Sequence, residues 1–150
     1  MRSNLPPFSK RSRRGQSVVE LALTSPFLLL FSLVVSDASR VYFTSIAVSN
    51  AAKAGAQYGA QSLAKSGDIS GAQNAATADA PDVYGITATA SVYCECPSQS
   101  GTFSCSSVNN CADKRAYVEV DTSATFHTLI KYPGIPDSVP ISGQAVMRVE

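Results

Sequence analysis

Near its N-terminus the chain carries a stretch whose hydrophobic residues are continuous rather than alternating. No residue between Leu21 and Ser36 is charged, and Glu20 is the one charge between Gln16 and Ser36. A helix must present about 20 apolar residues to cross the roughly 30 Å of hydrocarbon in a bilayer. No other segment of the sequence meets this requirement, so the pattern predicts a membrane-spanning helix over residues 16–36.

The pattern becomes alanine-rich after this stretch. Alanine, the best helix former, recurs from residue 38 to residue 64, and no proline occurs between residues 27 and 80. We therefore expect one continuous helix over residues 16–64, about 70 Å long at 1.5 Å per residue. A chain of 150 residues cannot bury all of this helix, so its apolar surface requires lipid or neighbouring copies. Pro26 removes one helical hydrogen bond, and we expect a kink there.

Residues 65–150 predict a small α+β head. Ser66 and Gly67 end the long helix, Asp68 is a suitable N-cap for a second helix over residues 69–80, and Pro81 stops that helix. Three antiparallel strands follow, whose apolar face can pack on the long helix. We expect these strands over residues 86–93, 116–126 and 141–149. The proline-rich residues 127–140 are expected to form a loop with one helical turn at Thr128–Lys131.

All four cysteines lie close together in the sequence, at Cys94, Cys96, Cys105 and Cys111. Their spacing differs from the paired C-x-x-C knuckles of structural zinc sites, so we expect two disulfides. Cys94 and Cys96 point to the same face of a strand and are not expected to bond to each other. Two pairings remain, 94–111 with 96–105 or 94–105 with 96–111. We favour the first because it closes a simple hairpin-like loop, in which residues 97–110 are exposed.

The charge is segregated along the chain, although the net charge is only +1. Five of the twelve lysines and arginines precede residue 15, where no acid occurs, so residues 16–150 carry seven bases against eleven acids. Because basic flanks stay in the cytoplasm, we expect a cytoplasmic N-terminus and a head across the membrane, where disulfides persist. Only 15% of the residues are charged, which argues against a disordered tail and against nucleic acid as a partner.

The sequence offers little that predicts an enzyme. His127 is the only histidine, and neither a G-x-S-x-G motif nor a glycine-rich phosphate loop is present. The acids other than Glu20 are scattered, without the cluster that calcium requires. We therefore expect no catalytic residue, no cofactor, no metal and no small-molecule substrate.

Three interpretations of the N-terminal segment compete. A cleaved secretory signal needs a small-x-small site, and Ser36-Asp37-Ala38 is a poor one. A twin-arginine signal would use Arg13 and Arg14, but the residues that follow are not hydrophobic. The third interpretation is a retained membrane helix. Glu20 is then its unusual feature, because a carboxylate inside an apolar helix is unfavourable and indicates a functional role.

Glu20 has two possible roles. It can simply lie at the lipid interface, in the first helical turns, where the helix dipole tolerates acids. Alternatively, the chain is cleaved after Gly15, which makes Gln16 the new N-terminus and Glu20 the fifth residue of the mature chain. In an assembled fibre the Glu20 carboxylate could then pair with the N-terminal amine of a neighbouring copy, which neutralises two desolvated charges.

One stretch of the sequence shows an ordered set of motifs. It reads Arg14-Gly15-Gln16-Ser17-Val18-Val19-Glu20-Leu21-Ala22-Leu23, followed by Pro26 and a Leu/Phe run. An Asp-x-x-Arg motif follows within residues 36–42, and an Asn-Ala-Ala motif within residues 49–60. In this order the motifs resemble the start of TadE-like pseudopilins of the tight-adherence (Flp pilus) system.

The resemblance implies a type IV pilin-like fold with a basic leader over residues 1–15, a long helix over 16–64 and a head over 65–150. It implies a minor pseudopilin that a prepilin peptidase cuts between Gly15 and Gln16 and that takes part in assembling or priming a Flp-type pilus. Glu20 and Pro26 would serve assembly by contacting other pilin subunits or the assembly platform. The implied location is the bacterial inner membrane, in a single pass, with a periplasmic or extracellular head. Whether the chain enters the fibre is left open.

Two other functions remain open. The chain could be a membrane-anchored, disulfide-stapled extracytoplasmic module for binding or adhesion that is never cut at Gly15. It could also be a secreted protein released near residue 38. The N-terminus of the mature chain distinguishes these possibilities.

Overall fold

The computed structural model describes residues 15–97, 99–106, 111, 113–131, 134 and 136–150. The basic cluster at residues 10–14 and most of the expected leader lie outside the described residues, as does part of the expected loop at 97–110. The chain divides into two compact units, Met1–Ala38 and Ser39–Glu150. We call the second unit the head from here on.

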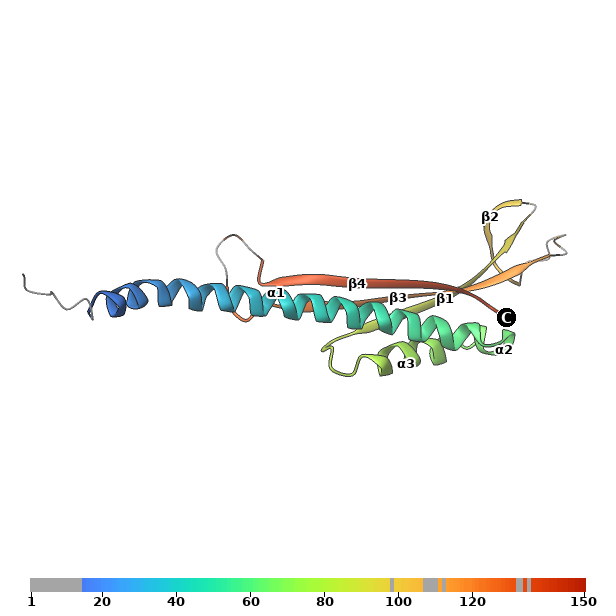
Figure 1. Cartoon of the computed structure of the whole chain (residues 1–150). Helices are drawn as coiled ribbons and strands as arrows, with labels where there is room; N and C mark the ends of the chain where they lie inside the picture. Colours follow the sequence, from blue (N-terminus) through green and yellow to red (C-terminus); the bar gives the residue numbers. More distant parts are fainter. Residues whose placement is uncertain (1–14, 98, 107–110, 112, 132–133, 135) are drawn as a thin grey trace, which may run out of the picture. The chain divides into compact units, whose positions relative to one another are not determined.

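Helix α1 runs from Gln16 to Ala60 and is continuous through Pro26 (Figure 1). It ends four residues before the expected boundary, because Ser62 adopts an extended conformation and starts a new turn. The Ser62 side chain accepts a hydrogen bond from the amide of Lys65, which caps the short helix α2, Leu63–Ser66. The carbonyl of Ala60 accepts a hydrogen bond from the amide of Glu150, so the end of α1 is tied to the end of the chain described here.

Helix α3, Ile69–Asp79, confirms the second expected helix. Its N-cap is Asp68, whose carboxylate accepts a hydrogen bond from the Gly71 amide at 2.9 Å. Ala72 and Ala76 are the buried residues of this helix. Small side chains therefore form its packing face.

The head contains one antiparallel sheet with the strand order β2-β1-β3-β4. Three of the strands confirm the expected ones, and β2 was not anticipated, because its residues were expected in the exposed loop. The expected helical turn at Thr128–Lys131 was wrong, since Leu129 and Ile130 form a bend and the residues on either side have no regular structure. The strands are β1 Thr87–Cys96, β2 Gln99–Phe103, β3 Arg115–His127 and β4 Ser138–Arg148.

One face of the sheet is covered by helices, and the other is open to solvent. In β3 every second residue from Val118 to Phe126 is buried, as alternation along a strand requires. Val118 and Val120 pack with Ala56 of α1 and Ala76 of α3, and Phe126 packs with Val48 of α1. Within the head, α1 and α3 therefore lie on the same face of the sheet (Figure 1). This confirms the α+β class, with a long apolar helix and a small antiparallel sheet.

Glycines allow the helices to approach the sheet closely. A Cβ atom on Gly59 would lie 2.8 Å from Cγ1 of Val118, and one on Gly55 would lie 2.8 Å from the carbonyl oxygen of Ala72. On the strand side, a Cβ atom on Gly143 would lie 2.8 Å from the Cα of Ser49. Gly55 and Gly59 are therefore required for the close packing of α1 against α3 and the sheet.

The four cysteines form two disulfides, but the favoured nested pairing was wrong. Cys94 is bonded to Cys105, and Cys96 is bonded to Cys111. The strand register explains this pairing. Cys94 lies opposite Phe103, so the chain leaving β2 passes beside Cys94 as it reaches Cys105. Glu95 lies opposite Arg115, the first residue of β3. Cys111 precedes Arg115 by four residues and therefore lies near the next residue of β1, Cys96.

Candidate functional site

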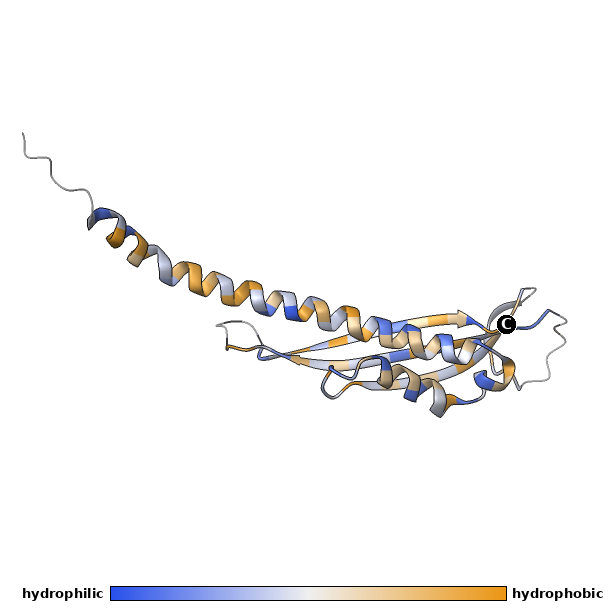
Figure 2. Ribbon diagram, turned by 60° about the horizontal axis from the view of Figure 1, so that its bottom comes forward, coloured by the Kyte–Doolittle hydropathy of each residue, from blue (hydrophilic) through white to orange (hydrophobic). Residues whose placement is uncertain are grey.

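The first candidate site is the N-terminal part of α1, from Gln16 to Ala38. Gly15 directly precedes the first residue of the helix. The large apolar side chains between Val18 and Val35 are all exposed, and the most apolar 18-residue window of α1 has no buried residue. Figure 2 shows this part of the helix as predominantly hydrophobic. By length and composition α1 could span a membrane, and it is the one such helix among the described residues.

Three hydroxyl groups within this apolar segment, those of Thr24, Ser25 and Ser32, donate to carbonyl groups of the helix itself. Thr24 donates to the carbonyl of Glu20 at 3.0 Å, and Ser32 donates to the carbonyl of Leu29 at 2.8 Å. A polar group without a partner costs several kcal/mol in hydrocarbon, where no water is available. These internal hydrogen bonds make the hydroxyl groups compatible with lipid.

Pro26 has a similar local compensation. It lacks an N–H group, so the carbonyl of Ala22, four residues earlier, loses its usual helical donor. The hydroxyl of Ser25 donates to this carbonyl at 3.4 Å. The segment therefore accepts a proline inside a helix without leaving the Ala22 carbonyl unpaired.

The predicted site residues are divided between the two units. Gly15, Gln16, Glu20 and Pro26 follow one another along the start of α1, and the Glu20 side chain is exposed. The four cysteines belong to the head, where Cys94 and Cys96 are buried. The N-terminal residues and the cysteines therefore belong to different units, and the disulfides join β1 to the segment between β2 and β3.

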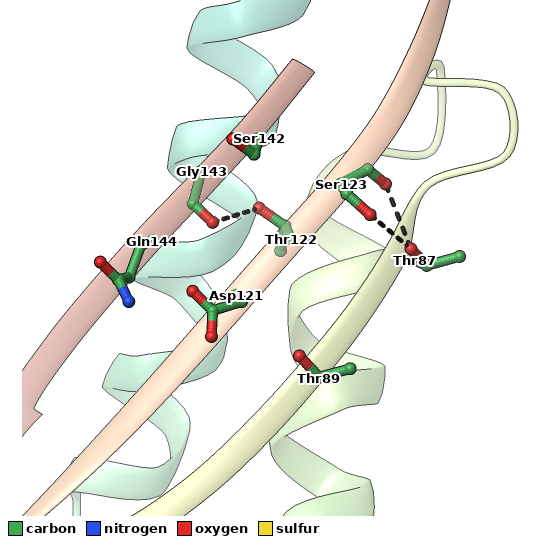
Figure 3. A pocket seen from close by; sticks show the side chains of 8 residues that line it. All are labelled: Thr87, Thr89, Asp121, Thr122, Ser123, Ser142, Gly143 and Gln144. Carbon is green, nitrogen blue, oxygen red and sulfur yellow. Dashed lines mark hydrogen bonds between the residues drawn. The ribbon is translucent and has the colours of Figure 1, made fainter. Parts of the chain in front are cut away.

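A second candidate site is a polar pocket on the open face of the sheet, with a volume of about 410 Å³. Figure 3 shows side chains from β1, β3 and β4 around it. Thr87 donates to the carbonyl of Ser123 at 3.3 Å, which links two of its walls. The pocket holds one carboxylate, from Asp121, and its other lining residues are Thr87, Thr89, Thr122, Ser123, Ser142, Gly143 and Gln144. This lining has no histidine or cysteine that could act as a base or nucleophile.

His127 lies elsewhere, at the end of β3, and its side chain is exposed. It lines a separate pocket of about 230 Å³ together with Arg40, Tyr84 and five other residues. The Arg40 guanidinium lies 5.1 Å from the centre of the Phe126 ring, a cation–π contact. Among the described residues no group of three His, Cys, Asp or Glu side chains could hold a metal ion.

Sequence reasoning identified Asp68 only as a helix cap, but it also joins two helices. The hydroxyl of Tyr58 in α1 donates to the Asp68 carboxylate at 2.8 Å. The Gly71 amide, Tyr58 and Ser70 all donate to this carboxylate, and they hold the pKa of Asp68 below its ordinary value. The same hydrogen bond to Asp68 is the main reason that the pKa of Tyr58 is raised. The one sequence signal for the contact between Tyr58 and Asp68 is that a tyrosine precedes the helix cap by ten positions.

The sequence comparisons agree with the geometry of the first site. The model of the TadE family, described as TadE-like protein, matches residues 15–57, which include the whole apolar segment and Gly55. No curated protein and no solved structure matches the chain. Residues 15–57 are therefore similar to the TadE-like family, which confirms the resemblance seen in the motifs of this segment.

Proposed function

We propose that this protein is a minor pseudopilin that takes part in assembling or priming a tight-adherence (Flp-type) pilus. In this proposal a prepilin peptidase removes residues 1–15, and the chain from Gln16 onward is the mature form. The observation that carries the proposal is the TadE-like match over residues 15–57, which covers a helix with an exposed apolar surface. Such a surface requires lipid before assembly and neighbouring subunits afterwards.

The proposed topology follows from the charge pattern. The arginines and lysine before Gly15 favour a cytoplasmic N-terminus, by the positive-inside rule. The head then lies in the periplasm or outside the cell, where its two disulfides are stable. The proposed partners are the prepilin peptidase, other pilin or pseudopilin subunits, the assembly platform and the inner membrane. In this role the chain is a substrate of the peptidase and performs no catalysis.

Cleavage is tested by measuring the intact mass of the protein purified from native membranes. The proposal expects a chain that begins at Gln16. The variant Gly15→Val should retain the leader, and a Cβ at Gly15 would meet no heavy atom within 4 Å, so the fold is not disturbed. A wild-type chain that begins at Met1 would contradict the proposal and favour the membrane-anchored binding module.

Assembly is tested with Glu20. We expect Glu20→Ala and Glu20→Gln to insert into the membrane and to be cleaved as the wild type is, but to reduce pilus formation, because the carboxylate is no longer available to a neighbour's N-terminal amine. The matched control is Asp79→Ala, which removes an exposed acid at the end of α3. Normal piliation in both Glu20 variants would exclude an assembly role for this carboxylate.

A further inference from the structure

A block of short polar side chains lies in the middle of the open face of the sheet. The strand register pairs two successive rows of residues across β1, β3 and β4, and all of these residues are exposed. We call this block the polar grid; its rows are Thr87, Ser123 and Ser142, and Thr89, Asp121 and Gln144. The polar grid lines the pocket of about 410 Å³ that is shown in Figure 3.

The backbone beneath the polar grid is held in place by α1. Thr122 and Gly143 complete the lining of the pocket. The Thr122 side chain points to the covered face of the sheet, where it is buried, and Gly143 lies directly against the backbone of Val48. On the open face, the hydroxyl groups of Thr87 and Ser123 lie 2.9 Å apart and form a hydrogen bond. The pocket is therefore formed before a ligand arrives, which lowers the entropic cost of binding.

The polar grid has hydrogen-bonding capacity that the protein does not use. Within the part of the chain that the structure describes, the side chains of Thr89, Asp121 and Ser142 form no hydrogen bond. The Gln144 side chain donates its amide N–H to Glu119, which leaves its carbonyl oxygen as an acceptor. The polar grid thus combines hydroxyl groups, which donate and accept, with a carboxylate and an amide oxygen, which only accept. A ligand that meets all of these groups must itself donate and accept at several positions.

The charge and lining of the pocket decide which ligand fits. Among the described residues that line it there is no lysine, arginine or histidine, so an anion would meet the Asp121 carboxylate without compensation. The volume of about 410 Å³ is usual for a ligand site, but most such sites have apolar walls. This lining consists of threonine, serine, aspartate and glutamine with one glycine. A neutral ligand that is rich in hydroxyl groups is therefore the best match.

We infer that the polar grid binds a neutral carbohydrate. The sugar hydroxyl groups donate to Asp121 and Gln144 and accept from the threonine and serine hydroxyl groups of the polar grid. The hydrogen bond to Asp121 should be the strongest, because its acceptor is charged. Ser91 and Glu119, which are paired in the next row of the open face, extend the polar surface along the strands, so a chain of sugar units can continue there. The polar grid lies entirely within the head, so the inference does not depend on the proposed role in a pilus.

The test measures binding to the full-length protein by isothermal titration calorimetry, in a detergent without a sugar headgroup. The neutral probes are maltohexaose, cellohexaose and N-acetylchitohexaose. Hexagalacturonate is the anionic comparison, and hexalysine is the cationic comparison. We expect at least one neutral probe to bind, and we expect neither charged probe to bind more tightly than that neutral probe.

Two exposed residues of the polar grid are replaced to locate the binding. Asp121→Ala should weaken the affinity about tenfold or more, because it removes a charged acceptor. Thr89→Val removes one hydroxyl group at nearly constant volume and should weaken the affinity about two- to tenfold. The matched controls are Asp79→Ala, at an exposed carboxylate of α3, and Thr125→Val, at an exposed threonine of β3 outside the pocket. Both controls should bind as the wild type does.

Failure of all three neutral probes to bind at millimolar concentration would overturn the inference. Equal affinity in the wild type, Asp121→Ala and Thr89→Val would also overturn it, because the sugar would then bind elsewhere. Tighter binding of hexalysine than of any neutral probe would overturn it in favour of a cationic ligand. Thermal unfolding of each variant shows whether the fold is intact. If Asp121→Ala does not fold, the comparison of Thr89→Val with Thr125→Val decides the outcome.

Discussion

The hydroxyl of Thr122 in β3 donates a hydrogen bond of 2.7 Å to the carbonyl of Val48 in α1. Both residues are buried, and they are 74 positions apart in the sequence. The hydroxyl also lies 3.3 Å from the carbonyl of Gly143 in β4. One polar side chain thus connects the long helix with the two strands beneath it, at the place where Gly143 lets the backbones approach.

We expect Thr122→Val to lower the free energy of unfolding by about 1 kcal/mol, because it removes a buried hydrogen bond at nearly constant volume. Thermal unfolding of the full-length protein in detergent micelles measures this loss. Thr122→Ser is the control that keeps the hydroxyl. If the valine variant were as stable as the wild type, the hydrogen bond would contribute nothing to the contact between α1 and the sheet.

The glycines of α1 should not tolerate a larger side chain. We expect Gly55→Ala and Gly59→Ala each to destabilise the head by about 1–3 kcal/mol, because overpacking forces neighbouring atoms to move. Gly55→Ala should be the more severe change, since it meets a backbone carbonyl, whereas Gly59→Ala meets the side chain of Val118.

Gly67→Ala is the matched control for these two variants. Its Cβ would have only an ordinary contact, 3.8 Å from the carbonyl oxygen of Ala64, and the backbone of Gly67 is already in the right-handed region. We expect no loss of stability there. An equal loss in all three variants would contradict the close-packing explanation, because Gly67 lacks a close neighbour and alanine favours a helix more than glycine does.

The disulfide pairing makes a prediction that thiol counting can check. The double variant Cys94→Ser/Cys105→Ser should have no free thiol after denaturation, because Cys96 and Cys111 remain bonded. Cys94→Ser/Cys111→Ser should have two, since each remaining cysteine has lost its partner. The opposite result would restore the nested pairing. Each bridge closes a short loop and should stabilise the head by about 3 kcal/mol.

The contact between Tyr58 and Asp68 predicts how stability depends on pH. The pKa of Asp68 is lowered in the folded chain, so the unfolded chain binds more protons at acid pH. The contribution of Asp68 to the stability of the fold should be complete above its ordinary pKa of 3.8. This contribution should be lost as the pH falls below that value toward the lowered pKa of the folded chain. The pKa of Tyr58 is raised, so its contribution should be complete below 10.0 and lost as the pH rises further.

Unfolding measured across this pH range in the wild type, Asp68→Asn and Tyr58→Phe separates the two effects. Asp68→Asn should flatten both sides of the profile, because the pKa of Tyr58 is raised mainly by its hydrogen bond to Asp68. Tyr58→Phe should flatten the alkaline side and only weaken the acid side, because Gly71 and Ser70 still donate to Asp68. An unchanged acid side in Asp68→Asn would show that other carboxylates govern acid unfolding.

The elements with strong local signals could be predicted from the sequence. The uncharged run from Leu21 to Ser36 and the alanines after it are sufficient for α1, and Asp68 before an alanine-rich run is sufficient for α3. The strand expected over residues 116–126, with an apolar face toward the long helix, corresponds to β3 and its buried face. Each of these signals lies within a few residues, where propensity and capping decide the outcome.

The features that depend on distant partners could not be predicted. Strand β2 is short and contains Gly101, with a φ of 111°, so its own residues resemble a loop, and it forms because β1 offers an edge. The disulfide pairing follows from the register of that hairpin, which the cysteine spacing does not encode. The hydrogen bond from Thr122 to Val48 likewise requires knowledge of where the helix crosses the sheet.

The small residues between α1, α3 and the sheet have a consequence for how the head responds to motion of its helix. Alanine and glycine have no rotamers to lose, so this joint forms with little loss of side-chain entropy. The contact between α1, α3 and the sheet is determined by the backbones, which cannot change rotamer. Long flexible side chains, in contrast, could repack. A rotation or displacement of α1 within the head should therefore move the strands as a rigid body, with little side-chain rearrangement between the helix and the sheet.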